Sequence, residues 1–75
     1  MNDRAAYYTN QRYMLKLTEE LNELAAEVMK FVNKGCCDPA NMCDKRVQKI
    51  ADEIADVEKW IERVKPIISI SNDDG

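Results

Sequence analysis

Two long stretches of the chain repeat apolar residues at alternating intervals of three and four positions. The first stretch carries Met14, Leu17, Leu21, Leu24, Val28 and Phe31, and the second carries Val47, Ile50, Ile54, Val57, Ile61 and Val64. This spacing places the apolar side chains on one face of an α-helix, at the a and d positions of a heptad. Each stretch therefore predicts an amphipathic helix, and the two apolar seams predict the core between them.

The ends of the first helix are marked by polar and glycine signals. We expect this helix to span about residues 10–34, with a cap within residues 9–10 or an extension back to residues 5–8. Lys34 followed by Gly35 is typical of a helix C-terminus, because a cation stabilises the last carbonyl groups and glycine adopts a left-handed conformation easily.

The second helix is expected to span about residues 39–65. Asp38 followed by Pro39 is typical of an N-cap and a first helical residue, and Asp44 is the alternative start. Pro66 disfavours helical geometry in the residue before it, so the helix is expected to end there. The residues after the second helix include a polar tail at 71–75 that is expected to fray.

The short connection between the two helices predicts that they are antiparallel neighbours. A chain of 75 residues forms one domain, and a domain of this size buries only about 60% of its extended surface. Such a domain usually needs staples or a partner subunit. The expected fold is therefore an all-α, antiparallel helix hairpin that oligomerises into a four-helix-type bundle.

Charge and cysteine content narrow the classes of function. The net charge of −3 lacks the basic footprint of a duplex nucleic-acid binder, and no run of about 20 apolar residues predicts a membrane span. The N-terminus lacks the apolar core of a signal peptide, so the expected location is the cytoplasm. Cys36, Cys37 and Cys43 occur without any histidine and match no common zinc spacing, which favours ordinary loop or core cysteines.

Four carboxylates form two pairs with the same spacing, Glu20 with Glu23 and Glu53 with Asp56. Spacing alone carries no information, because 14 acidic residues in 75 give about 2.6 such pairs by chance. Both pairs, however, occupy the g and c positions of their heptads. The g flanks of two antiparallel helices face each other, so the four groups are expected to lie within about one turn, ~5 Å along the axis.

Carboxylates gathered at one level repel each other, and a hard divalent cation such as Mg²⁺ removes that repulsion. By geometry alone, a metal site and a solvated acidic face are equally supported. Basic residues bracket the acids on the same stripe: Lys16, Lys30, Lys34, Arg46, Lys49 and Arg63. These cations suit the phosphates of a nucleotide, although pairing within each helix, as between Lys49 and Glu53, is the alternative. Trp60 suits either base stacking or a subunit interface.

The acidic segments resemble the signature of the MazG-like all-α nucleoside triphosphate pyrophosphohydrolases. That signature is Glu-Glu-x-x-Glu on one helix and Glu-x-x-Asp on the next, and it matches residues 19–23 (EELNE) and 53–56 (EIAD). The resemblance covers roughly residues 14–64. It implies Mg²⁺ (or Mn²⁺) held by Glu20, Glu23, Glu53 and Asp56, with Glu19 as a candidate supporting residue that points outward in the heptad frame.

The resemblance also implies a function. Family members cleave a nucleoside triphosphate to the monophosphate and pyrophosphate, act as dimers or tetramers, and clear nucleotide pools. Longer members carry a further segment that contacts substrate, so this chain resembles a compact version of the kind carried by small phage genomes. Substrate contacts are therefore expected from Lys30, Arg46, Lys49 and Trp60, or from another subunit. The alternative function is a non-catalytic nucleotide-binding or protein-interaction helical module.

Overall fold

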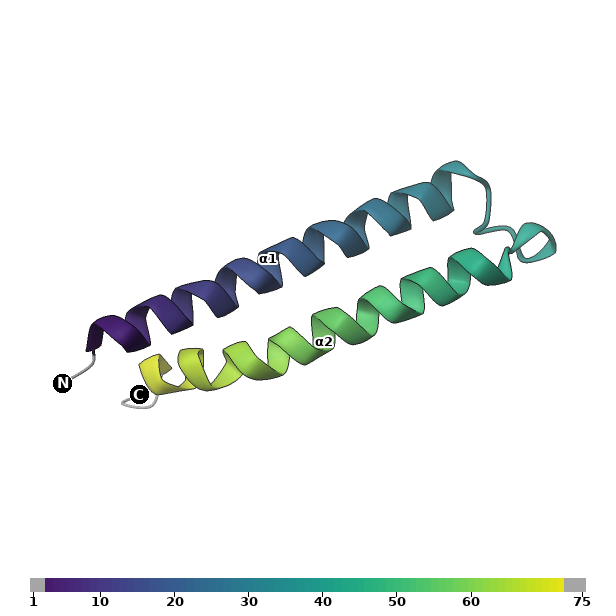
Figure 1. The fold of residues 1–75 in the computed structure, drawn as a ribbon. Helices are drawn as coiled ribbons and strands as arrows, with labels where there is room; N and C mark the ends of the chain where they lie inside the picture. Colours follow the sequence, from purple (N-terminus) through teal and green to yellow (C-terminus); the bar gives the residue numbers. More distant parts are fainter. Residues whose placement is uncertain (1–2, 73–75) are drawn as a thin grey trace.

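The protein is a hairpin of two long antiparallel α-helices joined by a short bend (Figure 1). The computed structural model describes residues 3–72 and contains α1 (Asp3–Asn33), the short 3₁₀-helix η1 (Pro39–Asn41) and α2 (Asp44–Asn72). Its principal extents are 57 × 25 × 16 Å, so two helices lie side by side in a single layer. The expected all-α hairpin is confirmed.

Gly35 ends α1 in the left-handed conformation that the sequence predicts, with φ of +76°. The N–H of Gly35 donates to the carbonyl of Val32, and the N–H of Cys36 donates to the carbonyl of Phe31, both at 3.0 Å. This pair of hydrogen bonds is the Schellman motif, which satisfies the last carbonyl groups of a helix. The turn directs the chain back along α1, and Cys36 becomes buried.

The predicted cap at Asp38 begins η1 and not the second long helix. The Asp38 side chain accepts a hydrogen bond of 3.0 Å from the N–H of Ala40, and Pro39 is the first residue of η1. The long helix α2 starts at Asp44, which is the alternative start inferred from the sequence. The carbonyl of Cys43 accepts the N–H groups of Arg46 and Val47, both at 3.0 Å.

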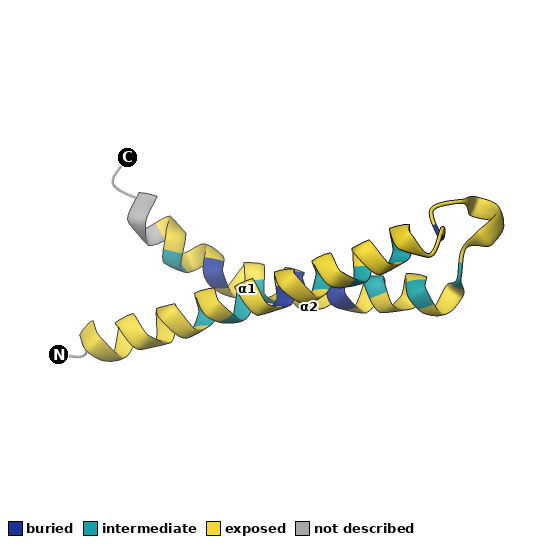
Figure 2. Ribbon diagram, turned by 90° about the horizontal axis from the view of Figure 1, so that it is seen from above, coloured by how far each residue is buried: buried dark blue, intermediate teal, exposed yellow. Residues whose placement is uncertain are grey.

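Both helices extend beyond their predicted outer ends. Helix α1 begins at Asp3, and α2 continues through Pro66 to Asn72, so the expected end at Lys65 is wrong. Pro66 is exposed, and the half-buried Ile67 continues the apolar pattern beyond it, which favours continuation of the helix. Of the tail expected to fray, residues 71–72 are helical and residues 73–75 lie outside the described part of the chain. The outer ends of the helices diverge (Figure 2).

Only half of each predicted apolar seam faces the other helix. The d positions are half-buried or buried: Leu17, Leu24, Phe31, Cys43, Ile50, Val57 and Val64. The g positions are also half-buried or buried: Tyr13, Glu20, Glu27, Arg46, Glu53, Trp60 and Ile67. The hairpin therefore closes along its d and g positions, and not along the a and d positions that the heptads predict.

The remaining half of the seam lies open to solvent. We call it the a-row; it contains Met14, Leu21, Val28, Val47, Ile54, Ile61 and Ile68, which are 36–48% exposed. Only three apolar residues of the described chain are buried, namely Cys36, Val57 and Val64, and no large side chain is fully buried. The core inside one hairpin is consequently thin, and Figure 2 shows a few buried positions along helices that are otherwise mostly exposed.

Candidate metal centre

Glu20 of α1 and Glu53 of α2 are the buried charged residues of the hairpin, with 7% and 8% of their surface exposed. Each glutamate occupies a g position near the middle of its helix. Because the g positions of the two antiparallel helices face each other, the two carboxylates enter the interface at the same level. Helix geometry thus places two acids where apolar residues would otherwise pack.

Glu23 completes a group of three carboxylates with the two buried glutamates. One oxygen from each of Glu20, Glu23 and Glu53 lies within 4.8 Å of the others. Among the described residues, this is the only group of three potential metal ligands in such proximity. Glu23 is exposed, so the group is buried on the inner side and open on the side that carries the c positions.

One oxygen of each buried glutamate has no hydrogen-bond partner. These atoms are Oε1 of Glu20 and Oε1 of Glu53. A buried acceptor without a partner costs about 1–3 kcal/mol, and more when the group is charged. Native structures rarely keep such atoms without a reason, which can be an ion or a catalytic role. A cation or another hydrogen-bond donor between the helices would satisfy both orphaned oxygens.

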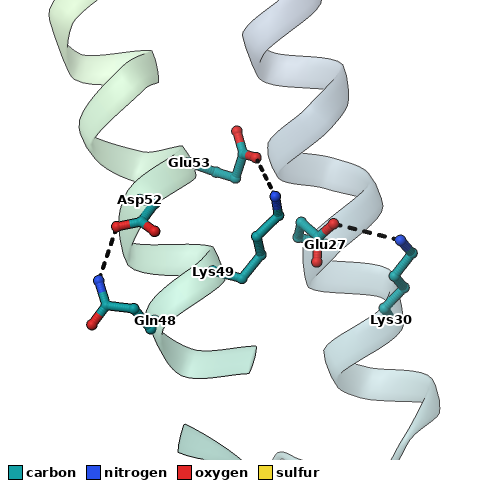
Figure 3. A network of polar contacts seen from close by, with 6 residues as sticks. All are labelled: Glu27, Lys30, Gln48, Lys49, Asp52 and Glu53. Carbon is teal, nitrogen blue, oxygen red and sulfur yellow. Dashed lines mark hydrogen bonds and ion pairs between the residues drawn. The ribbon is translucent and has the colours of Figure 1, made fainter. Parts of the chain in front are cut away.

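The other oxygen of each buried glutamate meets a lysine from one turn earlier on its own helix. The Nζ of Lys16 lies 3.5 Å from Oε2 of Glu20, and the Nζ of Lys49 lies 3.7 Å from Oε2 of Glu53. Figure 3 shows Lys49 and Glu53 beside α1, with Glu53 pointing from α2 toward that helix. Both lysine side chains stay partly exposed, at 43% and 55%. These pairings confirm the intrahelical alternative for both lysines.

The pKa of Glu23 reflects the crowding of negative charge. The pKa of Glu23 is raised above the ordinary glutamate value. The largest cause is the carboxylate of Glu20, followed by burial and by the charge of Glu53. Like charges at short range disfavour ionisation of each group. The three carboxylates thus repel each other, and a cation bound between them would reduce that repulsion.

The donor set fits a hard divalent cation. All three groups supply carboxylate oxygens, which Mg²⁺ and Mn²⁺ prefer over the nitrogen and sulfur ligands typical of zinc sites. A magnesium site commonly uses a few carboxylates and leaves other positions to water or phosphate. The open side next to Glu23 leaves space for such additional ligands. The residues present therefore suit Mg²⁺ or Mn²⁺.

Asp56 does not join the three-carboxylate group, although the sequence predicts it as a fourth ligand. It is exposed at a c position, one turn after Glu53. Its side chain is one methylene shorter than that of Glu23, which holds the corresponding c position on α1, and this difference limits its reach. Glu19 points outward as the heptad frame predicts, and its side chain is 65% exposed in a 3.4 Å pair with Lys16.

The predicted substrate residues lie on both sides of the acids. Lys30 pairs with Glu27 at 3.5 Å (Figure 3). Arg46 is half-buried and has no ion pair within the described chain. Trp60 makes an edge-to-face contact with Tyr13, with ring centres 5.7 Å apart, and the Arg63 guanidinium lies 4.6 Å from its ring centre. The indole is thus already engaged on one side.

Sequence reasoning missed the surroundings of Trp60. An open hollow of about 480 Å³ lies beside this tryptophan and is lined by Arg12, Tyr13, Leu15, Lys16, Glu19 and Trp60. Tyr13 occupies a g position, as Glu20 does. This common heptad position is the sequence signal that could have identified Tyr13 as part of the surroundings of Trp60. A larger hollow of about 740 Å³, lined by Asp3, Arg4, Tyr7, Tyr8 and Gln11, belongs to the first turns of α1 alone and includes none of the three acids.

The three cysteines are free thiols near the bend. Cys36 is buried, Cys37 is exposed and Cys43 is half-buried at the start of α2. Hydrogen bonds from the backbone amides of Arg46 and Lys45 lower the pKa of the Cys43 thiol. The thiols do not take part in the carboxylate group.

Comparisons with protein-family models, curated proteins and solved structures gave no significant match. Membership of the MazG-like family therefore stays a prediction from the motif residues. Neither helix, over its described length, has the apolar stretch needed to cross a membrane.

Proposed function

We propose that this chain is a Mg²⁺-dependent nucleoside triphosphate pyrophosphohydrolase that acts as a homo-oligomer. The observation that carries the proposal is the pair of buried glutamates, Glu20 and Glu53, each with an oxygen that lacks a partner. A hairpin that only needed stability would gain from apolar residues at these positions. Retaining two facing carboxylates there is typical of a functional site.

The proposed roles follow the layout of the hairpin. Glu20, Glu23 and Glu53 would hold the metal, with Asp56 one turn away on the same face. A divalent cation there supplies charge neutralisation and polarisation of a phosphoryl oxygen. Lys49 and the bend-side cations Lys30 and Arg46 would contact phosphates, and Trp60 would contact the base. The products would be the nucleoside monophosphate and pyrophosphate, and the proposed role is to clear nucleotide pools in the cytoplasm.

The exposed a-row supports the proposed oligomerisation. Its members come from both helices, repeat at heptad spacing and lie on the face opposite the c positions, where the acid group opens. A second copy presents the same apolar row, so two hairpins that pack along it form a four-helix bundle. This assembly would supply the core that a single hairpin lacks and leave the acid group accessible.

The activity is tested by measuring pyrophosphate release. Purified wild-type protein is expected to release pyrophosphate from at least one member of a panel of ribo- and deoxyribonucleoside triphosphates, in a reaction that requires Mg²⁺. Glu53→Ala is expected to lose at least about 100-fold in rate, the scale of losing a preorganised electrostatic group. Absence of turnover by the wild type on every nucleotide would refute the enzymatic claim.

A second candidate function is a non-catalytic helical module that binds nucleotide or a protein partner. The wide exposed a-row favours it, because such a surface serves assembly whether or not catalysis occurs. Nucleotide with Mg²⁺ would then raise the melting temperature without hydrolysis. The pyrophosphate assay combined with a melting curve separates the two functions.

A further inference from the structure

The sequence that carries the acid group is repeated in the two helices. Helix α1 carries Lys16, Glu20 and Glu23, and α2 carries Lys49, Glu53 and Asp56, with the same spacing in both helices. Because the helices run antiparallel and both glutamates occupy g positions, Glu20 and Glu53 face each other as approximate equivalents, whereas Asp56 lies outside the group that Glu23 joins. The lysine and glutamate of one helix therefore have equivalents on the other.

The contacts of the two buried glutamates are alike, although Lys16 also lies 3.4 Å from Glu19. In each helix the lysine lies against Oε2 of its glutamate, at 3.5 Å in α1 and 3.7 Å in α2, while Oε1 is buried without a partner. Each lysine thus neutralises only the outer oxygen of a buried carboxylate. The inner oxygens remain without a partner, so neutralisation by the lysines is incomplete.

We propose that Lys16 and Lys49 are exchangeable counter-ions: they pair with the buried glutamates when no metal is bound and turn to the phosphates of the ligand when metal is bound. The inference rests on the proposed metal centre. It names the ligand class as a metal-complexed polyphosphate, because two released ammonium groups flank the site. It also identifies Lys16 as a binding residue equivalent to Lys49.

The small energies of the lysine–glutamate pairs favour exchange of the lysines for a metal ion. Partly exposed lysine–glutamate pairs contribute about 0.2–1 kcal/mol to stability. A divalent ion that binds the same oxygens therefore displaces the lysines readily. Lysine carries its charge on a flexible four-carbon stem, so its ammonium group can reorient without movement of the helix. Metal and lysine compete for the acids, whereas metal and phosphate support each other's binding.

The test measures two affinities by calorimetry: Mg²⁺ alone, and inorganic tripolyphosphate in saturating Mg²⁺. The double variant Lys16→Met/Lys49→Met is expected to bind Mg²⁺ alone about two- to five-fold more tightly, because the competing cations are gone. The same variant is expected to bind tripolyphosphate about ten-fold more weakly, because charge-assisted contacts are lost. The two affinities should change in opposite directions.

Two control variants separate this mechanism from a general loss of positive charge. Lys45→Met removes a charge one turn before Lys49, from an exposed side chain without an ion pair in the described chain, and should leave both affinities within about two-fold. Lys16→Arg/Lys49→Arg keeps both charges and should stay close to wild type. Circular dichroism verifies that each variant is folded.

Each outcome decides between distinct claims. Unchanged or weaker Mg²⁺ binding by the methionine double variant, with wild-type protein that binds Mg²⁺ normally, would overturn the exchange and leave the metal centre standing. An equal gain in Mg²⁺ affinity for Lys45→Met would also overturn it. Wild-type protein that binds no Mg²⁺ would overturn the metal centre and the exchange together.

Discussion

Glu53→Gln is expected to stabilise the metal-free protein and to abolish its stabilisation by Mg²⁺. Glu53 is 92% buried, lies beside Glu20 and Glu23, and leaves Oε1 without a partner, so its charge opposes folding when no cation is bound. Glutamine keeps the shape and removes the charge. Removing the charge is therefore expected to stabilise the metal-free protein, and loss of the 3.7 Å pair with Lys49 offsets only about 0.2–1 kcal/mol of that stabilisation.

The expected net gain is about 1 kcal/mol or more, which raises the melting temperature of a domain of this size by roughly 4–8 °C. The measurement is thermal unfolding in a chelator and again in excess Mg²⁺, at one fixed protein concentration because an oligomer's stability depends on it. Wild-type protein should gain stability from Mg²⁺, and the variant should not. Such opposite effects on stability and function are common at binding sites.

Glu62→Gln is the matched control for this prediction. Glu62 lies on the same helix, is exposed, and pairs with Lys65 at 2.9 Å. The same chemical change there should alter stability by less than about 0.5 kcal/mol and leave the response to Mg²⁺ intact. A metal-free Glu53→Gln protein that is clearly less stable than wild type would mean that the carboxylate is satisfied in the native protein, contrary to the account given above.

Ile54→Glu is expected to convert the oligomer to monomers. Within one hairpin Ile54 is 41% exposed, so a glutamate there disturbs the hairpin itself only slightly. In a bundle that packs along the a-row, every copy would bury an unpaired charge in place of an apolar side chain. Losing the part of the apolar burial that the interface would supply and burying an unpaired charge together cost about 1.5–3 kcal/mol per copy, so the dissociation constant should rise at least about 100-fold.

Analytical ultracentrifugation checks this prediction through the mass of the particle and its dependence on concentration. Ala55→Glu is the control, because it places the same side chain on an adjacent exposed residue outside the a-row. Ala55→Glu should keep the wild-type mass. An Ile54→Glu protein with the mass and melting temperature of the wild type would show that the a-row is not the interface.

The apolar pattern predicted the two helices and their antiparallel pairing correctly, because period and turn chemistry are local properties of the chain. Gly35 ended α1 as expected for the same reason. The expectation that α2 ends before Pro66 was wrong, because the local preference of proline was outweighed by an apolar pattern that continues beyond it at the half-buried Ile67. Local rules do not weigh such packing.

The sequence could not predict which positions of the heptad meet inside the hairpin. Apolar a and d positions allow more than one rotation of each helix about its axis. The rotation found here buries the g positions, so Glu20 and Glu53 lie between the helices and not on a solvated flank. Three of the four predicted carboxylates converge as a result, whereas Asp56 stays outside the group.

The most direct test of the metal centre is a titration of ¹⁵N-labelled protein with Mn²⁺, followed by nuclear magnetic resonance. A paramagnetic ion broadens the amide signals nearest to it. The signals around Glu20, Glu23 and Glu53 should broaden first, at substoichiometric Mn²⁺, and excess Mg²⁺ should restore them. Broadening that begins elsewhere, such as around the exposed Glu58 or Glu62, or that spreads evenly over the chain, would contradict a metal site between the two helices.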